Sequence, residues 1–370
     1  MSDTVEQFSR VSVLQASQRE LGAQFAISHG WEMADVYSNP IEEYDAVRTN
    51  AGLVDLSYYG AIKIWGGEAI QFLNGLVSND VKTLAPGSGM RAAFLTGHGK
   101  VRAIARVLNL GDDFLVITDP QTHEKILKYI LPFSYAGDFH VEDVSEQFRL
   151  LSLQGPKANL VMKEVSFQPV PQLSDYGWFQ TLIAGHQALA VKASHTGEQG
   201  FDLLVSESAL PDVWDFILLK GKFHLLAPVG LRALESLRIE ASQPEYGVDV
   251  DETNMLLEVG LPDIVSFNKG CYTGQEAVAM ATYRGHVSKR LSGILVKGEV
   301  VPSRGDVIKK DDKEIGAITS AISSPTLASI IALGYVKYGF FEAGNAVEIE
   351  SDGDSLQASI VEVPFYRRFD

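Results

Sequence analysis

Residues 266–291 read SFNKGCYTGQEAVAMATYRGHVSKRL, and the character of the sequence changes across this stretch. Before it, apolar residues with helical spacing alternate with short strand-like runs, which predicts an α+β fold. After Arg290 short apolar runs recur about every eight to twelve residues, with Gly and Asp-Gly turns between them. This pattern predicts a small antiparallel β-barrel over residues 291–370 and a domain boundary near residue 290.

The composition is that of a soluble globular protein. The chain has 370 residues, of which 46% are hydrophobic and 21% charged, and it is long enough for two or three cores because single cores rarely exceed about 250 residues. A net charge of −16 argues against nucleic acid and anionic membranes as main partners. A small anionic ligand can still bind where arginines and lysines gather locally.

The start of the chain, MSDTVEQFSRVS, has neither the basic nor the apolar region of a signal peptide. No apolar run is long enough for a membrane-spanning helix. The chain has a single cysteine and therefore cannot form an intrachain disulfide. Proteins of a reducing compartment commonly lack disulfides. We therefore expect a cytoplasmic protein that does not span a membrane.

Two helices are expected near the N-terminus. Residues 11–26 carry apolar positions three and four apart, which is typical of an amphipathic helix. A second helix should run to about residue 50, with Asn39 as its cap, Pro40 in its first position and Glu42 placed to bond back to the cap.

The clearest helical pattern is APVGLRALESLRIEA, residues 227–241. Pro228 is expected at the start of this helix, and Arg232, Glu235 and Arg238 are spaced to form ion pairs on one face. Upstream, TGEQGFD (196–202) predicts a tight turn between two strands, with Glu198 at its tip.

Cys271 is the only cysteine of the chain. The cation Lys269 favours the reactive thiolate form, and the flanking glycines leave the backbone open. The alternative is a buried apolar residue, as free cysteines often are, but the polar surroundings argue for reactivity. A thiol hydrolase with His286 as base lacks a local signature, and one cysteine with scattered histidines predicts no bound metal.

Two further residues have both a plain and a functional interpretation. Glu198 could be a solvated carboxylate in a turn, or it could accept two parallel hydrogen bonds from the amide and amine of a pterin ring. Arg238 could form a surface ion pair, which contributes little, or it could contact a ligand.

These features, in this order, point to a family. The segments 234–261 and 266–291, with KGCYTGQE and a following YRG, resemble the YgfZ-type folate-binding proteins implicated in iron–sulfur protein maturation. Residues 20–60, FLNGLVSND (72–80) and SPTLASIIALGYV (324–336) resemble the glycine-cleavage T-protein, an aminomethyltransferase. The resemblance covers nearly the whole chain.

The resemblance implies a cloverleaf of three domains around a central folate cavity. Residues 1–290 would form two interleaved subdomains, roughly 1–50 with 145–225 and 51–144 with 226–290, and residues 291–370 the barrel. Glu198 would hold the pterin of tetrahydrofolate. Further folate contacts are expected from Arg238, Tyr59, Tyr272, Gln275 and Arg284.

The resemblance also contains a departure. In T-proteins the stretch that resembles HGKVRAIARVL (98–108) carries a catalytic aspartate, whereas this chain has Ala103 and Ile104. An apolar side chain cannot replace a charge aimed at the reacting amine. The first hypothesis is therefore an accessory protein that binds tetrahydrofolate and supports assembly or repair of iron–sulfur client proteins, with Cys271 as working thiol and Lys269 as its activator.

Two alternatives stay open at this point. The chain could be an enzyme that transfers an aminomethyl or methyl group to tetrahydrofolate. It could also be a folate sensor or scaffold without catalytic activity.

Overall fold

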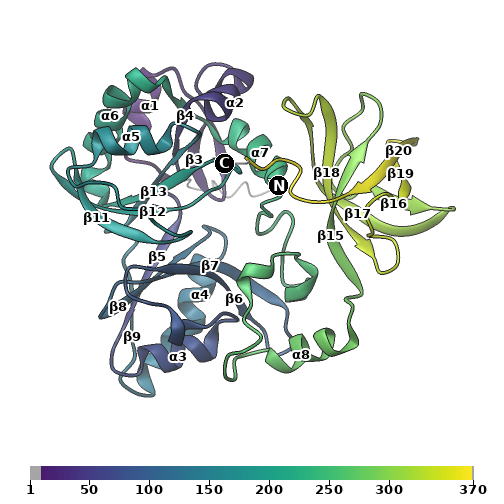
Figure 1. The fold of residues 1–370 in the computed structure, drawn as a ribbon, viewed down its shortest axis with the longest axis horizontal. Coiled ribbons are helices and arrows are strands. Elements are labelled where there is room, and N and C mark those ends of the chain that lie inside the picture. Colours follow the sequence, from purple (N-terminus) through teal and green to yellow (C-terminus); the bar gives the residue numbers. More distant parts are fainter. Residues whose placement is uncertain (1–9, 369–370) are drawn as a thin grey trace, which may run out of the picture. The chain divides into compact units, whose positions relative to one another are not determined.

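The computed structural model describes residues 10–368 (Figure 1). The chain folds into two compact units, each discontinuous in sequence. Among the described residues, unit 1 comprises 10–61, 143–194 and 198–235, and unit 2 comprises 62–142, 195–197 and 236–368. No helix within residues 10–368 is long and apolar enough to cross a membrane.

Unit 1 is built on a six-stranded sheet in the order β11-β12-β13-β10-β4-β14, in which only the edge pair β14–β4 is parallel. Every residue of the inner strands β4, β10 and β13 is buried, including the polar residues Ser152, Gln154 and Asp202. The elements are β4 (Ala51–Asp55), β10 (Arg149–Gln154), α5 (Ala158–Val165), β11 (Trp178–Ile183), β12 (His186–Lys192), β13 (Gly200–Val205), η3 (Glu207–Ala209), α6 (Leu210–Gly221), η4 (Lys222–His224) and β14 (Leu226–Val229).

The N-terminal part of unit 1 differs from the expected long helix over residues 11–26. Helix α1 covers only Gln15–Glu20, and Gln24–Ser28 is a strand, β2, that pairs with β3. The helix stops because Gly22 takes a positive φ of 89°, the left-handed conformation that ends many helices. The remaining elements are β1 (Arg10–Val11), β3 (Trp31–Val36) and α2 (Pro40–Thr49).

The start of α2 was predicted correctly except for one carboxylate. The Asn39 side chain accepts a hydrogen bond from the Ile41 amide at 2.9 Å, and Pro40 opens the helix. Glu42 is exposed, and it is Glu43 that turns back into the protein. Its carboxylate accepts from the amides of Tyr37 (2.6 Å), Ser38 (2.9 Å) and Gly230 (2.7 Å).

The helix predicted over residues 227–241 begins later than expected. Pro228 lies in β14, an edge strand, where its missing N–H costs no ladder bond. Helix α7 runs Leu231–Glu240 and spans the boundary between the two units. Of the predicted ion pairs, Arg232 bonds instead to Asp35 of β3 at 2.5 Å.

Unit 2 contains a five-stranded sheet in the order β6-β7-β8-β5-β9. Ala103, Ala105 and Val107 of β7 pack in a core with Leu73 of α3 and Ile126 of α4, so these helices cover one face of the sheet. The elements are β5 (Gly60–Trp65), α3 (Ala69–Leu76), η1 (Val81–Thr83), β6 (Gly89–Leu95), β7 (Val101–Asn109), β8 (Asp113–Thr118), α4 (His123–Ile130), η2 (Leu131–Tyr135) and β9 (His140–Asp143).

The predicted barrel is confirmed. Six strands close in the order β15-β18-β17-β16-β19-β20, each antiparallel to its neighbours, around an apolar interior that includes Ile294, Ile308 and Ile349. The strands are β15 (Lys289–Val296), β16 (Val307–Lys310), β17 (Lys313–Ser324), β18 (Ser329–Lys337), β19 (Ala346–Ser351) and β20 (Asp354–Val361), and η5 (Leu256–Glu258), η6 (Pro262–Ile264) and α8 (Gln275–Arg284) precede them.

Candidate functional site

Glu198 lies in unit 1, two residues before β13, and its side chain is fully buried. The Arg48 guanidinium, from the last turn of α2, donates to Glu198 Oε1 at 3.1 Å. The Arg48 side chain is itself 6% exposed and lies 5.4 Å from the centre of the Tyr44 ring. A buried carboxylate requires such a partner because isolated charges are costly inside proteins. Glu198 is therefore a buried member of an ion pair and not a solvated turn residue.

A second buried carboxylate, which the sequence interpretation missed, follows on β13. Asp202 is fully buried, and the Ser152 hydroxyl of β10 donates to it at 2.7 Å. Gln154 donates both to Ser152 Oγ (2.9 Å) and to the Ala193 carbonyl (3.0 Å). These bonds connect β10 to β13 and to the residue after β12 through polar side chains.

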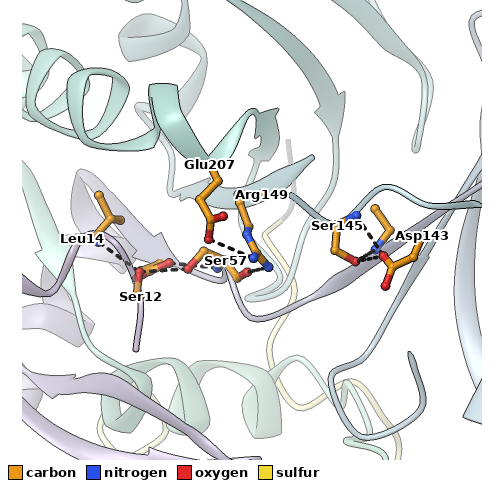
Figure 2. Close-up of polar contacts among 9 residues, drawn as sticks. Ser12, Leu14, Ser57, Asp143, Ser145, Arg149 and Glu207 are labelled. Carbon is orange, nitrogen blue, oxygen red and sulfur yellow. Dashed lines mark hydrogen bonds and ion pairs between the residues drawn. The ribbon is translucent and has the colours of Figure 1, made fainter. Parts of the chain in front are cut away.

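The loop after β4 is held by a polar network within unit 1 (Figure 2). Arg149 of β10 donates to the Ser57 carbonyl at 3.2 Å and to Glu207 at 2.9 Å. The hydroxyls of Ser12 and Ser57 are 3.1 Å apart. The predicted site residue Tyr59 follows in this loop, with its ring 5.4 Å from the ring of Tyr58.

Arg238 belongs to unit 2 and is buried, so the surface ion pair is excluded. Its guanidinium bonds to Asp249 (2.8 Å), Glu245 (3.2 Å) and Ser320 Oγ of the barrel (3.2 Å). The carbonyl of Gln243 accepts from the same group at 3.2 Å. These bonds connect the end of α7 to strand β17.

The KGCYTGQE segment is also in unit 2, where Cys271 is exposed and Tyr272 is buried. Gln275 opens α8, and its side-chain oxygen accepts from the Tyr272 amide at 3.2 Å. Burial lowers the pKa of Lys269 to about 8. Arg284 ends α8, and its side chain lies outside the described part of the structure.

Strand β7 carries no carboxylate where the resemblance places one. Ala103 is buried, and Ile104 packs against an apolar cluster. Because side chains alternate along a strand, Arg102 and Arg106 share the face of Ile104. Across the ladder Arg91 is paired in register with Arg106. The alternation R-A-I-A-R was visible in the sequence and indicates a cationic face.

A histidine near this face has a strongly shifted pKa. Burial, and then the charges of Arg106 and Arg91, lower the pKa of His195 to about 3. Arg91 itself forms a two-pronged ion pair with Asp263, both distances being 2.7 Å. His195 is therefore neutral at ordinary pH, and it was not recognised from the sequence.

The predicted site residues are divided between the units. Glu198 and Tyr59 belong to unit 1, whereas Cys271, Lys269, Arg238, Tyr272, Gln275 and Arg284 belong to unit 2. Their assignment to one folate cavity thus stays a prediction. Within residues 10–368 no group of three His, Cys, Asp or Glu side chains is placed to hold a metal ion.

The chain is similar to known proteins over nearly its full length. The family of GCVT N-terminal domains matches residues 14–269, and the family of glycine cleavage T-protein C-terminal barrel domains matches residues 289–367. An aminomethyltransferase of Halothermothrix orenii is 32% identical over 94% of this chain and 97% of its own length. One of Lysinibacillus sphaericus is 31% identical over 94% of this chain and 95% of its own length.

A solved structure has the same fold. The glycine cleavage system aminomethyltransferase T from Bartonella henselae covers 98% of this chain and 99% of its own, with a TM-score of 0.90 at 23% identity. The expected T-protein fold with its C-terminal barrel is confirmed.

The expected role in assembling or repairing iron–sulfur client proteins, with Cys271 as working thiol, is wrong. That hypothesis rested on the KGCYTGQE motif and on the missing aspartate at Ala103 and Ile104, whereas relatives that match 94% of the chain are named aminomethyltransferase. Both domain families match in their T-protein order, and together they span almost all described residues. The chain belongs to the glycine cleavage T-protein family.

Proposed function

We propose that this chain binds tetrahydrofolate and acts as an aminomethyltransferase or a closely related one-carbon transferase. The relatives with that name support this proposal, and the buried Arg48–Glu198 pair carries it. An ionised carboxylate accepts two parallel hydrogen bonds, which matches the amide and exocyclic amine of a pterin. Bound tetrahydrofolate would supply the nitrogen that accepts the one-carbon unit.

The protein's own contribution is to hold the Glu198 carboxylate in place for the pterin. Arg48 donates to one oxygen of Glu198, while packing on Tyr44 restrains the arginine. Burial removes competing water, so hydrogen bonds to the carboxylate gain strength. Glu198 therefore needs little rearrangement to bind a planar donor pair.

The cationic face of β7 favours a second candidate, folate binding without turnover. Developing positive charge on a reacting amine is stabilised by a nearby carboxylate, and this face has Ile104 between Arg102 and Arg106. The YgfZ-type subfamily assignment, which rests on KGCYTGQE, stays a prediction under either candidate. A turnover assay separates the two candidates.

Binding is tested by fluorescence titration with tetrahydrofolate. Glu198→Gln should weaken binding about 10- to 100-fold, because a hydrogen bond to a charged group contributes roughly 1.5–3 kcal/mol. Glu42→Gln, an exposed glutamate of α2, is the matched control and should bind normally. Equal affinity of wild type and Glu198→Gln would remove Glu198 from the site.

Turnover is tested with an aminomethyl-loaded lipoyl carrier protein and tetrahydrofolate. A transferase releases ammonia and forms methylene-tetrahydrofolate. Tight folate binding without either product would refute the transferase and support the second candidate.

A further inference from the structure

The ammonium group of Lys269 sits in a ring of three backbone carbonyls, which we call the carbonyl cradle. It donates to Asn74 O at 2.7 Å, Val77 O at 2.7 Å and Asn79 O at 2.6 Å. These are short, charge-assisted hydrogen bonds. An ammonium has three donors, so the cradle satisfies the group completely.

The cradle exists because of how α3 ends. The last carbonyls of a helix lack intrahelical donors and carry the negative end of its dipole. After Leu76 the chain turns away, and the Ser78 amide bonds to Ala93 O at 2.9 Å instead of to Asn74 O. The carbonyl of Asn74 is thereby left to an external donor, and those of Val77 and Asn79 point to the same place.

The ammonium holds the segment that carries Cys271. The Ser266 amide bonds to Ser78 O, and the Thr273 amide bonds to Gly75 O, both at 3.0 Å. Lys269 lies between these two anchors and is followed directly by Gly270 and the exposed Cys271. Releasing the ammonium would loosen residues 267–271, whereas Tyr272 stays held by its burial and by its amide bond to Gln275.

We propose that the carbonyl cradle is a monovalent-cation site, filled in the native chain by the tethered ammonium of Lys269 and open to potassium when that charge is removed. Rings of backbone carbonyls replace the hydration shell of potassium in selective channels, and an ammonium is a monovalent cation that makes the same contacts. This site is separate from the proposed folate contact of Glu198, and its test needs no folate.

The groups around the carbonyl cradle determine the pH at which the Lys269 ammonium loses its charge and binds the carbonyls less strongly. Burial lowers the pKa of Lys269 to about 8, with Lys82 lowering it further and Asp80 opposing both. The Tyr272 ring lies 5.0 Å from the ammonium. Above a pH of about 8 the amine becomes neutral and loses a donor, so potassium should compete there even in the wild-type chain.

The test replaces Lys269 by alanine, which removes the ammonium together with its stem and so leaves room for a cation beside the three carbonyls. Hydrogen exchange of residues 264–274, and the reaction rate of Cys271 with an aromatic disulfide, are measured in potassium chloride and in choline chloride at equal ionic strength. Choline is too large to enter the cradle. Lys163→Ala, at an exposed lysine of α5, is the control and should match the wild type in both salts.

In choline, Lys269→Ala should speed both reactions by about tenfold, the loss expected for a charged hydrogen bond. Potassium should restore most of the difference. Equal rates for Lys269→Ala and wild type in both salts would overturn the proposal, as would loosening that potassium does not reverse. If the variant does not fold, the wild type at about pH 9.5 should exchange more slowly in potassium than in choline, and equal rates there would also overturn it.

Discussion

Replacing Asp249 by asparagine tests whether an ion pair within the protein holds the Arg238 guanidinium. The Asp249 side chain is fully buried and accepts four hydrogen bonds. One oxygen takes Arg238 Nη1 (2.8 Å) and the Glu245 amide (3.0 Å). The other takes the hydroxyls of Thr319 (2.5 Å) and Ser320 (2.7 Å).

The Asp249→Asn substitution removes only part of these interactions. Asparagine keeps the volume, its oxygen can face Arg238, and its amide can donate to the hydroxyls, which are free to accept instead. The charge of the pair is the main loss, so we expect destabilisation of about 1.5–3 kcal/mol. Arg238→Met should cost more, about 3–5 kcal/mol, because it leaves Asp249 buried and charged.

The assay is urea unfolding of wild type, both single variants and the double variant. Because the two side chains are in contact, the double variant should be more stable than the sum of the singles predicts, by about 1–3 kcal/mol. Additive effects, or an Asp249→Asn chain within about 0.5 kcal/mol of wild type, would refute the reasoning. Folate affinity lost in Arg238→Met but kept in Asp249→Asn would assign the guanidinium to the ligand as well.

Three further changes have defined outcomes. Glu43→Gln should lower the free energy of unfolding by about 1–3 kcal/mol in urea, since its carboxylate binds three backbone amides; an unchanged midpoint would contradict this. Gly316→Ala should lower the melting temperature, because a Cβ there would lie 2.0 Å from Tyr335 O in the barrel; a melting temperature equal to wild type would show that β17 and β18 can separate. His195→Gln should flatten the pH dependence of stability. In the folded protein the pKa of His195 is about 3, below its ordinary value of 6.5. The stability that neutral His195 contributes is therefore complete above pH 6.5 and is lost as the pH falls toward 3, by up to about 1.4 kcal/mol per pH unit. Parallel curves for wild type and variant between those limits would rule out this contribution.

The barrel and the start of α2 could be predicted from the sequence because local signals determine them. Alternating runs separated by turns are sufficient to indicate short antiparallel strands. Asn39 and Pro40 are side chains whose preferred places at a helix start depend only on their neighbours.

Other features depend on contacts between distant segments. Glu43 rather than Glu42 turns inward because the Gly230 amide lies there to be bound, and spacing from the cap cannot reveal this. Pro228 lies in a strand rather than in a helix because β14 pairs with β4 in parallel. Such tertiary pairings override local preference.

The same division holds for the candidate site. Glu198 could be singled out from TGEQGFD, but Arg48, its partner 150 residues earlier, could not. Lys269 appeared in the sequence as an activator of Cys271, whereas the structure shows its ammonium bonded to the end of α3. A lysine two residues from a cysteine can point anywhere, and only the fold places the carbonyls it meets.

Strand β7 bears on the proposed function through the carboxylate that it lacks. Its sequence is VRAIARVLN, with Ala103 and Ile104 where the T-protein resemblance places a catalytic aspartate. A carboxylate stabilises the positive charge that develops on a reacting amine, and an apolar side chain does not. If this chain transfers an aminomethyl group as proposed, that carboxylate must therefore come from a segment other than β7.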